Sequence, residues 1–280
     1  GKGVLVQGDH FSTKDEALGL CRRILKDTAS VLIEEKFDGE EFSLQCLCDG
    51  KTVVGTPLVQ DHKRRFDGDC GPNTGGMGSY SLPDHSMPFL RPSDIEEGLE
   101  ITRRVAAALW EETGSPYKGV MYGGFIATKN GARLLEYNAR FGDPECQVLM
   151  MRFEGDLVEL LLAAATDGGL ANVNRPRLSD EYALTVVMAA KGYPGTPEKG
   201  GHIRIGNVGA ARVFHAGTAV NDSQLVANGG RVLNITALGS SVTDAQAAAY
   251  AAVDAIDFPS GFCRRDIGWR EVVRERSDAE

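Results

Sequence analysis

The sequence predicts an α+β protein of two domains, and three observations support this fold class. Asn130-Gly131 separates two apolar runs, which is a strong short signal for an antiparallel hairpin. Capping boxes beginning at Thr13 and at Ser93 precede apolar residues at helical spacing. The length of 280 residues is long for one core, and a polar stretch at 172–180 with Arg-Pro-Arg in its middle separates two halves.

The elements follow in chain order from periodicity and turn residues. In the first domain, 1–175, we expect helices from Thr13 to about Lys26, from Ser93 to near Gly114, and from Pro144 to about Ala165 with a break at Gly155, and strands at 30–35, 41–48, 51–58, 119–127 and 132–138. In the smaller second domain, 176–280, we expect strands at 182–190, 212–216 and 231–237, and a helix capped by Thr243 with Gln246 that runs to Ile256.

Composition excludes several classes of function. The formal net charge of −9 argues against a general nucleic-acid binder, because phosphate contacts need clustered Lys and Arg. No apolar run reaches the length of a membrane span, and no signal-peptide pattern opens the sequence, so we expect a cytoplasmic protein that binds no membrane. The six cysteines show no zinc spacing, and we expect most to be buried thiols in a reducing compartment.

The strand after the Asn-Gly turn presents candidate metal ligands. Side chains alternate along a strand, so Leu134, Glu136 and Asn138 should share one face. The carboxylate and the amide oxygen then lie roughly 7 Å apart at the backbone, close enough to bind one hard cation. The alternative is a pair of solvated residues on an edge strand, but Leu134 on the same face favours partial burial.

The next residues predict a helix start and an anion contact. Asp143 is a good N-cap and Pro144 suits the first helical position, although this pair could mark a helix start and nothing more. The free N–H groups of that helix would face the metal ligands. Arg140 lies between the two features, and its planar guanidinium suits a phosphate or an acyl phosphate.

A glycine-rich segment at 69–80 predicts a binding loop. Four glycines and one proline within eight residues, 71–78, exclude a helix or a central strand. The backbone N–H groups of such a loop can surround an anion, whereas the alternative is a flexible surface loop. His62, just before it, is expected to be a hydrogen-bonded structural histidine, as are His202 and His215 in the second half.

Two further segments are weaker candidates for nucleotide contacts. A strand end at Glu34 leaves backbone free to contact adenine, and Glu40 follows at a spacing that suits ribose hydroxyls. Taken alone, this acidic segment favours a surface turn. Lys2 stands between two glycines and could reach a phosphate, but the motif by itself has low specificity.

Together these motifs resemble the glycinamide ribonucleotide synthetase family, the phosphoribosylamine-glycine ligases of the ATP-grasp superfamily. The resemblance covers essentially the whole chain, and its most specific part is Arg140-Phe141-Gly142-Asp143-Pro144-Glu145. The other matching segments are Gln60-Asp61-His62-Lys63-Arg64, the run 71–78, Phe214-His215-Ala216-Gly217-Thr218, Asn228-Gly229-Gly230-Arg231-Val232 and the run 262–269. The resemblance implies an ATP-grasp fold of antiparallel sheets with flanking helices, followed by a smaller α+β domain.

The resemblance also implies an activity and roles for these residues. The family couples ATP hydrolysis to joining glycine with 5-phosphoribosylamine in purine biosynthesis, through a glycyl phosphate. Glu136 and Asn138 would hold Mg²⁺ or Mn²⁺ against the ATP phosphates, and Arg140 would steady the phosphoryl group in transfer. Nucleotide contacts would come from Lys2, Glu34, Phe37 through its backbone, and Glu40. Contacts to glycine and the amine would come from Asp61, Lys63, Asn73, Gly75, Gly76 and Asp143.

Two departures from the family pattern keep other functions open. The family has an N-terminal domain before the position where this chain begins, and part of the amine site would lie there. The strand at 119–127 lacks the second metal-binding acid that many ATP-grasp enzymes carry, so water and ATP oxygens would complete the shell. The alternatives are an ATP-grasp ligase for another carboxylate, or a nucleotide-binding fragment that is inactive without a separate N-terminal domain. The sequence does not determine the oligomeric state.

Overall fold

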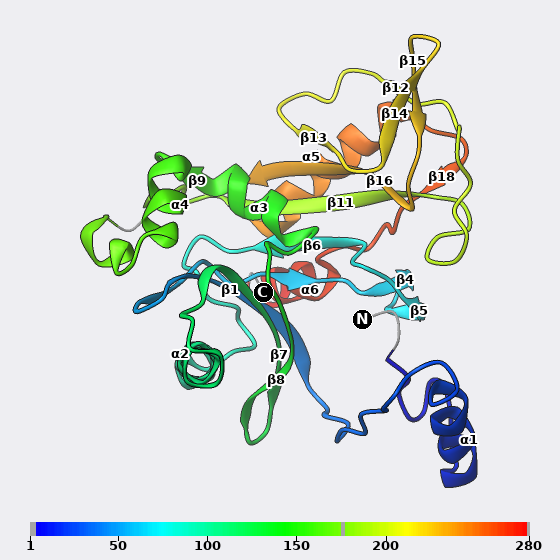
Figure 1. The fold of residues 1–280 in the computed structure, drawn as a ribbon. Coiled ribbons are helices and arrows are strands. Elements are labelled where there is room, and N and C mark those ends of the chain that lie inside the picture. The colour runs from blue at the N-terminus through cyan, green and yellow to red at the C-terminus, as the bar shows by residue number, and fades with distance from the viewer. Residues whose placement is uncertain (1–3, 175–176, 279–280) are drawn as a thin grey trace.

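The computed structural model describes residues 4–174 and 177–278, which form two antiparallel sheets with helices packed around them (Figure 1). The small sheet has the strand order β2-β1-β7-β8, and the large sheet has the order β13-β16-β11-β6-β3 with β18 paired to β11. This arrangement confirms the α+β fold class. The predicted boundary between 175 and 176 falls on residues outside the described part.

The helices and strands have the following bounds. The helices are α1 (Lys14–Ile24), α2 (Pro92–Thr113), α3 (Glu145–Arg152), α4 (Leu157–Ala165), η1 (Gly169–Asn172, a 3₁₀ helix), α5 (Val242–Asp254) and α6 (Trp269–Asp278). The sheet strands are β1 (Glu40–Asp49), β2 (Val53–Gly55), β3 (Gln60–Asp61), β6 (Gly78–Ser81), β7 (Lys118–Thr128), β8 (Gly131–Asn138), β11 (Tyr182–Ala190), β13 (Arg212–His215), β16 (Arg231–Gly239) and β18 (Gly261–Phe262). Short pairs are β4 (Arg64–Phe66) with β5 (Cys70–Asn73), β9 (Phe153–Glu154) with β10 (Arg177–Leu178), β12 (Arg204–Ile205) with β17 (Ile256–Asp257), and β14 (Thr218–Asn221) with β15 (Gln224–Ala227).

Strand β1 organises the small sheet because its residues alternate in polarity. Phe42, Leu44 and Cys46 are buried on the face that α2 covers, where the Phe42 ring stacks on Phe125 of β7 at 5.5 Å between ring centres. Ser43 and Gln45 are also buried, but they lie on the opposite face. The alternation therefore separates an apolar packing face from a polar face.

The chain passes directly from the small sheet to the large one. Val59 exchanges backbone hydrogen bonds with Ser43 of β1, and the next two residues, β3, pair with β6. Strand β6 then pairs with β11, so the large sheet contains strands from both sides of the predicted boundary. Helix α5 packs on β11 and β16, and α3 packs on the same two strands and on β6.

Strand β6 corrects the expectation that 69–80 is one loop. The segment forms β5 and β6 and leaves only 74–77 as a connecting turn, and β6 lies inside the large sheet between β3 and β11. Gly78 makes this possible, because a Cβ there would lie 2.6 Å from the Thr185 carbonyl oxygen and 2.7 Å from the Ile267 side chain. Glycine here permits close packing of strands instead of disrupting a strand.

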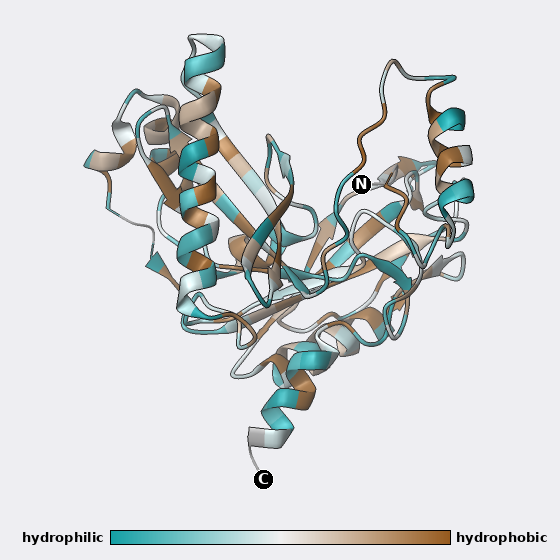
Figure 2. Ribbon diagram, turned by 90° about the horizontal axis from the view of Figure 1, so that it is seen from below, coloured by the Kyte–Doolittle hydropathy of each residue, from teal (hydrophilic) through white to brown (hydrophobic). Residues whose placement is uncertain are grey.

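Helix α1 and the irregular segment after it stand apart from the two sheets in both views (Figures 1 and 2), whereas Asp9, before α1, forms an ion pair with Arg64 of β4. Helix α1 has the predicted Thr13–Glu16 capping box, but none of its residues is buried. The predicted strand at 30–35 is wrong: it has no regular structure, and Leu32 and Ile33 are each 78% exposed. No described strand pairs with this segment, so its apolar pattern has no sheet to join.

Two helix starts also differ from the prediction. Helix α2 begins after Arg91, whose backbone N–H and guanidinium both donate to Asp94, so the helix starts before Ser93. Helix α5 is capped by Ser241, and the Thr243 hydroxyl instead donates to Glu275 of α6. In both cases, the N-cap residue that the structure uses, Arg91 or Ser241, lies two residues before the predicted one.

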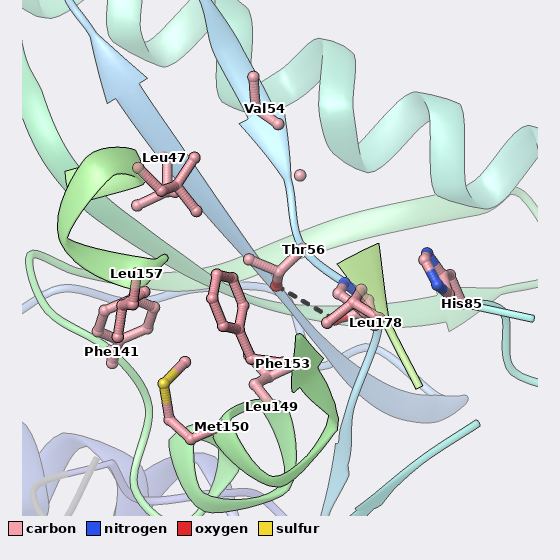
Figure 3. Close-up of a pocket in the computed structure, with 13 residues that line it drawn as sticks. Leu47, Val54, Thr56, His85, Phe141, Leu149, Met150, Phe153, Leu157 and Leu178 are labelled. Atoms are coloured by element: carbon pink, nitrogen blue, oxygen red, sulfur yellow. Dashed lines mark hydrogen bonds between the residues drawn. The ribbon is translucent and has the colours of Figure 1, made fainter. Parts of the chain in front are cut away.

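The described residues include an apolar pocket of about 140 Å³ between the small sheet and helices α3 and α4 (Figure 3). Leu47, Phe141, Met150 and Phe153 line it, together with other apolar side chains. Thr56 and His85 supply the only polar side chains among its described lining residues. The pocket lacks the charged groups that a nucleotide requires.

None of the described helices is both long enough and apolar enough to cross a membrane.

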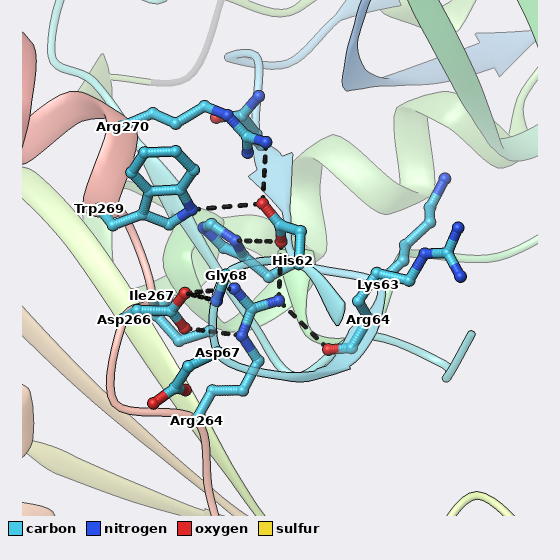
Figure 4. A network of polar contacts seen from close by, with 12 residues as sticks. His62, Lys63, Arg64, Asp67, Gly68, Arg264, Asp266, Ile267, Trp269 and Arg270 are labelled. Carbon is cyan, nitrogen blue, oxygen red and sulfur yellow. Dashed lines mark hydrogen bonds and ion pairs between the residues drawn. The ribbon is translucent and has the colours of Figure 1, made fainter. Parts of the chain in front are cut away.

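A buried ionic network joins the turn after β4 to the C-terminal segment (Figure 4). Arg264 is 1% exposed and donates to Asp69 at 2.8 Å and to both carboxylate oxygens of Asp266 at 2.7 and 2.8 Å. Asp69 also pairs with Arg270 at 2.8 Å. Burial acts to raise the pKa of Asp69, but the adjacent His62 and Arg264 hold that pKa well below its ordinary value.

His62 has the structural role that the sequence predicts. Its Nε2 accepts a hydrogen bond from the Gly268 N–H at 2.9 Å, which assigns the ring proton to Nδ1. Nδ1 in turn lies 3.6 Å from the Asp69 carboxylate. In the second half, His215 Nδ1 contacts the Thr218 hydroxyl at 3.1 Å, and His202 is exposed.

Gly78→Ala should lower the free energy of unfolding by roughly 1–3 kcal/mol, because the added methyl overlaps the Thr185 carbonyl. Gly98→Ala in α2 is the matched control, since its Cβ meets only ordinary contacts and helical alanine is favoured by about 0.5–1 kcal/mol. Urea unfolding measures both. Equal midpoints for the two variants would contradict the packing role of Gly78.

Asp69→Asn should lower the free energy of unfolding at neutral pH by up to about 3–5 kcal/mol, because Arg264 loses a buried charged partner. Folding depresses the pKa of Asp69, so its stabilisation is present above the unfolded pKa, about 4, and is lost as the pH falls below that value. Urea unfolding across pH should show a constant difference from wild type above about pH 5 and a shrinking one below about pH 4. Asp254→Asn, in an exposed ion pair, should show little effect.

Candidate functional site

The β7–β8 hairpin presents the predicted metal ligands on the polar face of the small sheet. Its turn at Asn130-Gly131 and its strands agree with the sequence prediction. Across the sheet, Gln45 of β1 lies opposite Tyr122 of β7, and Tyr122 lies opposite Asn138 of β8. Glu136 lies opposite Gly124, two residues along β7 from Tyr122. We call this face, with Gln45, Tyr122, Glu136 and Asn138, the site face.

A bulge in β8 corrects the predicted position of Leu134. Gly124 pairs with Glu136 and the next residue, Phe125, pairs with Leu134, so Leu135 is the extra residue. Leu134 therefore shares the apolar face with Phe125 and does not share the face of Glu136. A shared face with Leu134 had predicted that Glu136 is partly buried. Because the bulge puts the two residues on opposite faces, Glu136 is exposed.

Glu136 and Asn138 fit a hard divalent cation as a pair of oxygen ligands on one face. Arg140 lies beside them: it donates to the Phe141 carbonyl at 2.7 Å and to the Asn138 amide oxygen at 3.4 Å. No group of three His, Cys, Asp or Glu residues within 4–174 and 177–278 could hold a metal by itself. Two protein ligands suit Mg²⁺, which keeps several water or phosphate oxygens in its shell.

Lys63 lies among carboxylates next to this face. It forms an ion pair with Glu41 and interacts electrostatically with Asp61 and Glu145. Burial by itself acts to lower the pKa of Lys63, but the charges of Asp61 and Glu41 raise it above its ordinary value. Burial and the charge of Glu41 also raise the pKa of Asp61. The cluster thus contains one cation and a surplus of acidic groups.

Tyr122 connects this cluster to the site face. Its hydroxyl donates to Glu145 at 2.7 Å, and the charges of Glu145, Asp61 and Glu136 add to burial in raising its pKa. Glu145 is 2% exposed, and burial together with the charge of Asp61 raises its pKa to about 7. The three carboxylates therefore lie within electrostatic reach of one tyrosine. From the sequence, Glu145 was recognised only as part of the family motif and was given no role. Tyr122 and Glu41 were not predicted as site residues.

A signal for Glu41 was present in the alternation of β1. Glu41 is two residues before Ser43 and four before Gln45, so it shares their face. Glu40 instead forms an ion pair with Arg274 of α6 at 2.6 Å. The other carboxylate oxygen of Glu40 lies 3.4 Å from Gln60 Nε2. The Glu40 side chain, the predicted ribose contact, is therefore paired with Arg274 in this structure, and of these two neighbouring acids Glu41 lies on the site face.

The other predicted nucleotide residues lie away from this cluster. Glu34 is exposed and Phe37 is half-buried, both on the irregular segment between α1 and β1. Lys2 lies outside the described residues. The structure thus brings together the predicted metal residues, Arg140, Asp61 and Lys63, whereas Glu34 and Phe37 lie on the irregular segment after α1.

Helix α3 begins one residue later than predicted. Pro144, not Asp143, is its N-cap, and no side chain caps the helix. The Asp143 carboxylate accepts from Gln147 Nε2 at 3.3 Å, so it lies beside the first turn without capping it. The Gly142 N–H donates to Gln45 at 2.7 Å, which fixes the start of this segment to the site face.

The predicted substrate loop lies against the same helix start. Asn73 ends β5, and Gly75 and Gly76 form the turn before β6. A Cβ on Gly76 would lie 2.5 Å from the Pro144 ring, and Gly76 has a φ of +106°. Both facts require glycine. The Ser79 hydroxyl donates to the Pro144 carbonyl at 3.1 Å, which adds a second contact between the two segments.

Comparison with known protein families matches nearly the whole chain. Residues 1–146 match the family described as phosphoribosylglycinamide synthetase, ATP-grasp (A) domain. Residues 183–270 match phosphoribosylglycinamide synthetase, C domain.

Individual relatives agree with these matches. A phosphoribosylamine–glycine ligase of Mesorhizobium japonicum is 52% identical over 99% of this chain and 65% of its own length. The human trifunctional purine biosynthetic protein adenosine-3 is 41% identical over 98% of this chain and 27% of its own length. The chain therefore spans about 65% of the length of its single-function relatives.

Solved structures agree on the fold. The phosphoribosylamine–glycine ligase of Thermotoga maritima superimposes with a TM-score of 0.69 at 36% identity, over 84% of this chain and 57% of that one. A biotin carboxylase of Campylobacter jejuni gives a TM-score of 0.67 at 13% identity, over 93% and 56% of the two chains, and so shares the fold alone. Because the ATP-grasp match covers more than half of its residues, the chain belongs to the phosphoribosylglycinamide synthetase family.

Proposed function

We propose that the chain carries the ATP-dependent ligation of glycine to 5-phosphoribosylamine, giving glycinamide ribonucleotide, ADP and phosphate in purine biosynthesis. Relatives named phosphoribosylamine–glycine ligase are 46–52% identical to it. The observation that carries the proposal is that Glu136 and Asn138 share a face beside Lys63 and a surplus of carboxylates.

Charge supports the assignment of the substrate contacts. Lys63 suits the carboxylate of glycine or a phosphate, because its amino group stays protonated among Glu41, Asp61 and Glu145. The surplus acidic groups suit a positively charged amino group, because a bound cation relieves their mutual repulsion. Asp61 and Lys63 are therefore the proposed contacts to glycine. Asn73, Gly75, Gly76 and Asp143 are proposed to line the remaining substrate site.

Glu136 and Asn138 are the proposed ligands of Mg²⁺ or Mn²⁺. A divalent ion at this face would neutralise the ATP phosphates and polarise the phosphoryl group. Arg140 would hold the transferring phosphoryl group through its paired N–H donors. Glu34, Phe37 and Glu40 remain the proposed adenine and ribose contacts, with Lys2 at the phosphates. For Glu40, this role requires the Arg274 ion pair to open, whereas Glu41 already lies on the site face.

The chemistry needs positioning and charge neutralisation more than a protein nucleophile. A glycine carboxylate oxygen attacks the γ-phosphorus, and ADP leaves, which gives glycyl phosphate. The amine nitrogen of phosphoribosylamine then attacks the acyl carbon, phosphate leaves, and the nitrogen loses a proton. Lys63 and Arg140 stabilise negative charge in the first step, and the nearby carboxylates orient ammonium groups.

We assign the proposed binding roles to the two predicted domains. Residues 1–175 would bind nucleotide, metal and glycine, and residues 176–280 would complete the ligase as its C-terminal domain. The relatives are longer than this chain, and an N-terminal domain, on the same polypeptide or a separate one, is proposed to supply part of the amine site.

The activity is tested by phosphate release from ATP, with phosphoribosylamine generated in situ and glycine compared with other small carboxylates. Release should depend on glycine and should increase when an N-terminal domain from a relative is added. Release that is equal with another acid would indicate a different ATP-grasp ligase. Nucleotide binding without release, in either condition, would indicate a fragment that binds without turnover.

Glu136→Ala should weaken binding of the Mg²⁺–nucleotide complex by roughly tenfold or more, because one of two protein ligands is lost. The fold should persist, since Glu136 is exposed. Titration calorimetry with Mg²⁺ and ADP measures affinity, and urea unfolding checks stability. Glu111→Ala, on the exposed side of α2, is the control and should bind normally. Wild-type affinity in Glu136→Ala would show that the metal face is wrongly assigned.

A further inference from the structure

The turn at 74–77 is tied to distant parts of the chain. Arg231, the first residue of β16, and Tyr193, three residues beyond β11, both bond to Gly75. Arg231 also bonds to Asp143, the residue just before the cap of α3. We call Arg231 and Tyr193 the clasp.

The Arg231 guanidinium joins Gly75 to Asp143, which lies 68 residues later in sequence. Arg231 Nη1 donates to the Gly75 carbonyl and to the Asp143 carbonyl, and Nη2 lies 3.3 Å from the Asp143 carboxylate. The planar group has several fixed donors, so it can serve three acceptors at once. A lysine at this position has one nitrogen and cannot reproduce that geometry.

Tyr193 restrains the same turn from its other side. The Gly75 N–H donates to the Tyr193 hydroxyl at 2.7 Å, so Gly75 is bound through both its N–H and its carbonyl. The Tyr193 ring packs against Gly230, where a Cβ would lie 2.4 Å from the ring. The residue before Arg231 thus makes room for Tyr193, and the two parts of the clasp fit as one unit.

The turn itself is shaped to accept the clasp. A Cβ on Gly75 would lie 3.0 Å from the Arg231 guanidinium and 3.1 Å from the Tyr193 hydroxyl. The Thr74 hydroxyl accepts from the Gly76 N–H at 3.0 Å and donates to the Lys63 carbonyl at 2.8 Å. Through Thr74, the position of the turn is therefore linked to Lys63 in the acidic cluster.

We propose that Arg231 and Tyr193 are positioning residues that hold the 74–77 turn and Asp143 in one arrangement for the amino-acid substrate. This rests on the proposed function, which assigns Gly75, Gly76 and Asp143 to the substrate site. The bonds that define the clasp reach Gly75 and Asp143, which the proposed function assigns to the substrate site and not to the metal or the nucleotide. Loss of the clasp should therefore weaken use of glycine and leave use of ATP nearly unchanged.

The test uses Arg231→Lys and Tyr193→Phe in the 280-residue chain with hydroxylamine as the amine. Glycyl phosphate reacts with hydroxylamine to give glycine hydroxamate and phosphate, so the assay needs no phosphoribosylamine. The KM for glycine should rise roughly tenfold in Arg231→Lys, which loses a hydrogen bond from a charged group, and about fivefold in Tyr193→Phe, which loses a neutral one; the KM for ATP should change less than about twofold. Equal increases in both constants would overturn the proposal.

The controls lose comparable interactions elsewhere. Arg103→Lys alters ion pairs with Glu96 and Glu100 on α2. Tyr117→Phe removes a hydroxyl that donates to the Val120 carbonyl at 2.7 Å. Both controls should keep the wild-type KM for glycine. A similar rise in the controls would mean that any small loss of stability affects glycine, which would contradict a specific positioning role.

Amide hydrogen exchange provides a readout that does not depend on turnover. The Gly75 and Gly76 amides should exchange at least about tenfold faster in both clasp variants, whereas amides of β11 and β16 should keep their protection. Unchanged exchange at Gly75 would overturn the proposal. If wild type forms no hydroxamate with glycine, even after an N-terminal domain from a relative is added, the proposed function of this chain fails, and the exchange result alone decides whether the clasp orders the turn.

Discussion

The alternation of side chains along β1 is the constraint on which the rest of this structure depends. One set of residues, including Phe42 and Leu44, packs under α2 and against Phe125, which fixes the small sheet. The other set, Glu41, Ser43 and Gln45, faces Lys63, the Val59 backbone and the Gly142 N–H. One ten-residue strand therefore stabilises the sheet and orients three segments of the site. A register shift of one residue would exchange the two faces and remove both roles.

The electrostatics of the site follow from that placement. Burying Asp61 and Glu145 beside one lysine raises the pKa of each carboxyl, because the charged forms lose water and repel one another. Such a cluster is costly in an isolated chain and becomes favourable when cations bind. The ionic network around Asp69 and Arg264 differs, since its charges pair within the protein and need no ligand. The network around Asp69 and Arg264 thus pairs its charges within the protein, whereas the cluster around Lys63 holds more carboxylates than cations.

The sequence predicted the regular, locally encoded parts well. The Asn130-Gly131 hairpin, the Thr13 capping box and β11 follow from signals within a few residues, and all three agree with the structure. Glu136 and Asn138 share a face as predicted, because two residues of a strand are separated by one alternation. The family resemblance rests on the short motif 140–145, which local reading detects.

The errors have tertiary causes. The bulge at Leu135 depends on pairing with β7, so alternation alone placed Leu134 on the wrong face. Gly78 was taken as a loop residue because its close approach to Thr185 is visible only when β6 and β11 are paired. The ion pair between Glu40 and Arg274 was not foreseen, because the two residues are 234 positions apart in sequence. The clasp was missed for the same reason, since no local pattern links Arg231 to Gly75.

The distribution of thiols has a practical consequence for observing the substrate turn. Burial raises the pKa of Cys46 to about 12 and that of Cys48 and Cys146 to about 11, so these groups resist alkylating reagents near neutral pH. Cys70 is exposed at the start of β5, three residues before Asn73. A fluorophore attached at that sulfur would sit four residues before the turn that the clasp restrains, although Cys21 on α1 is partly exposed as well and would first be replaced by serine.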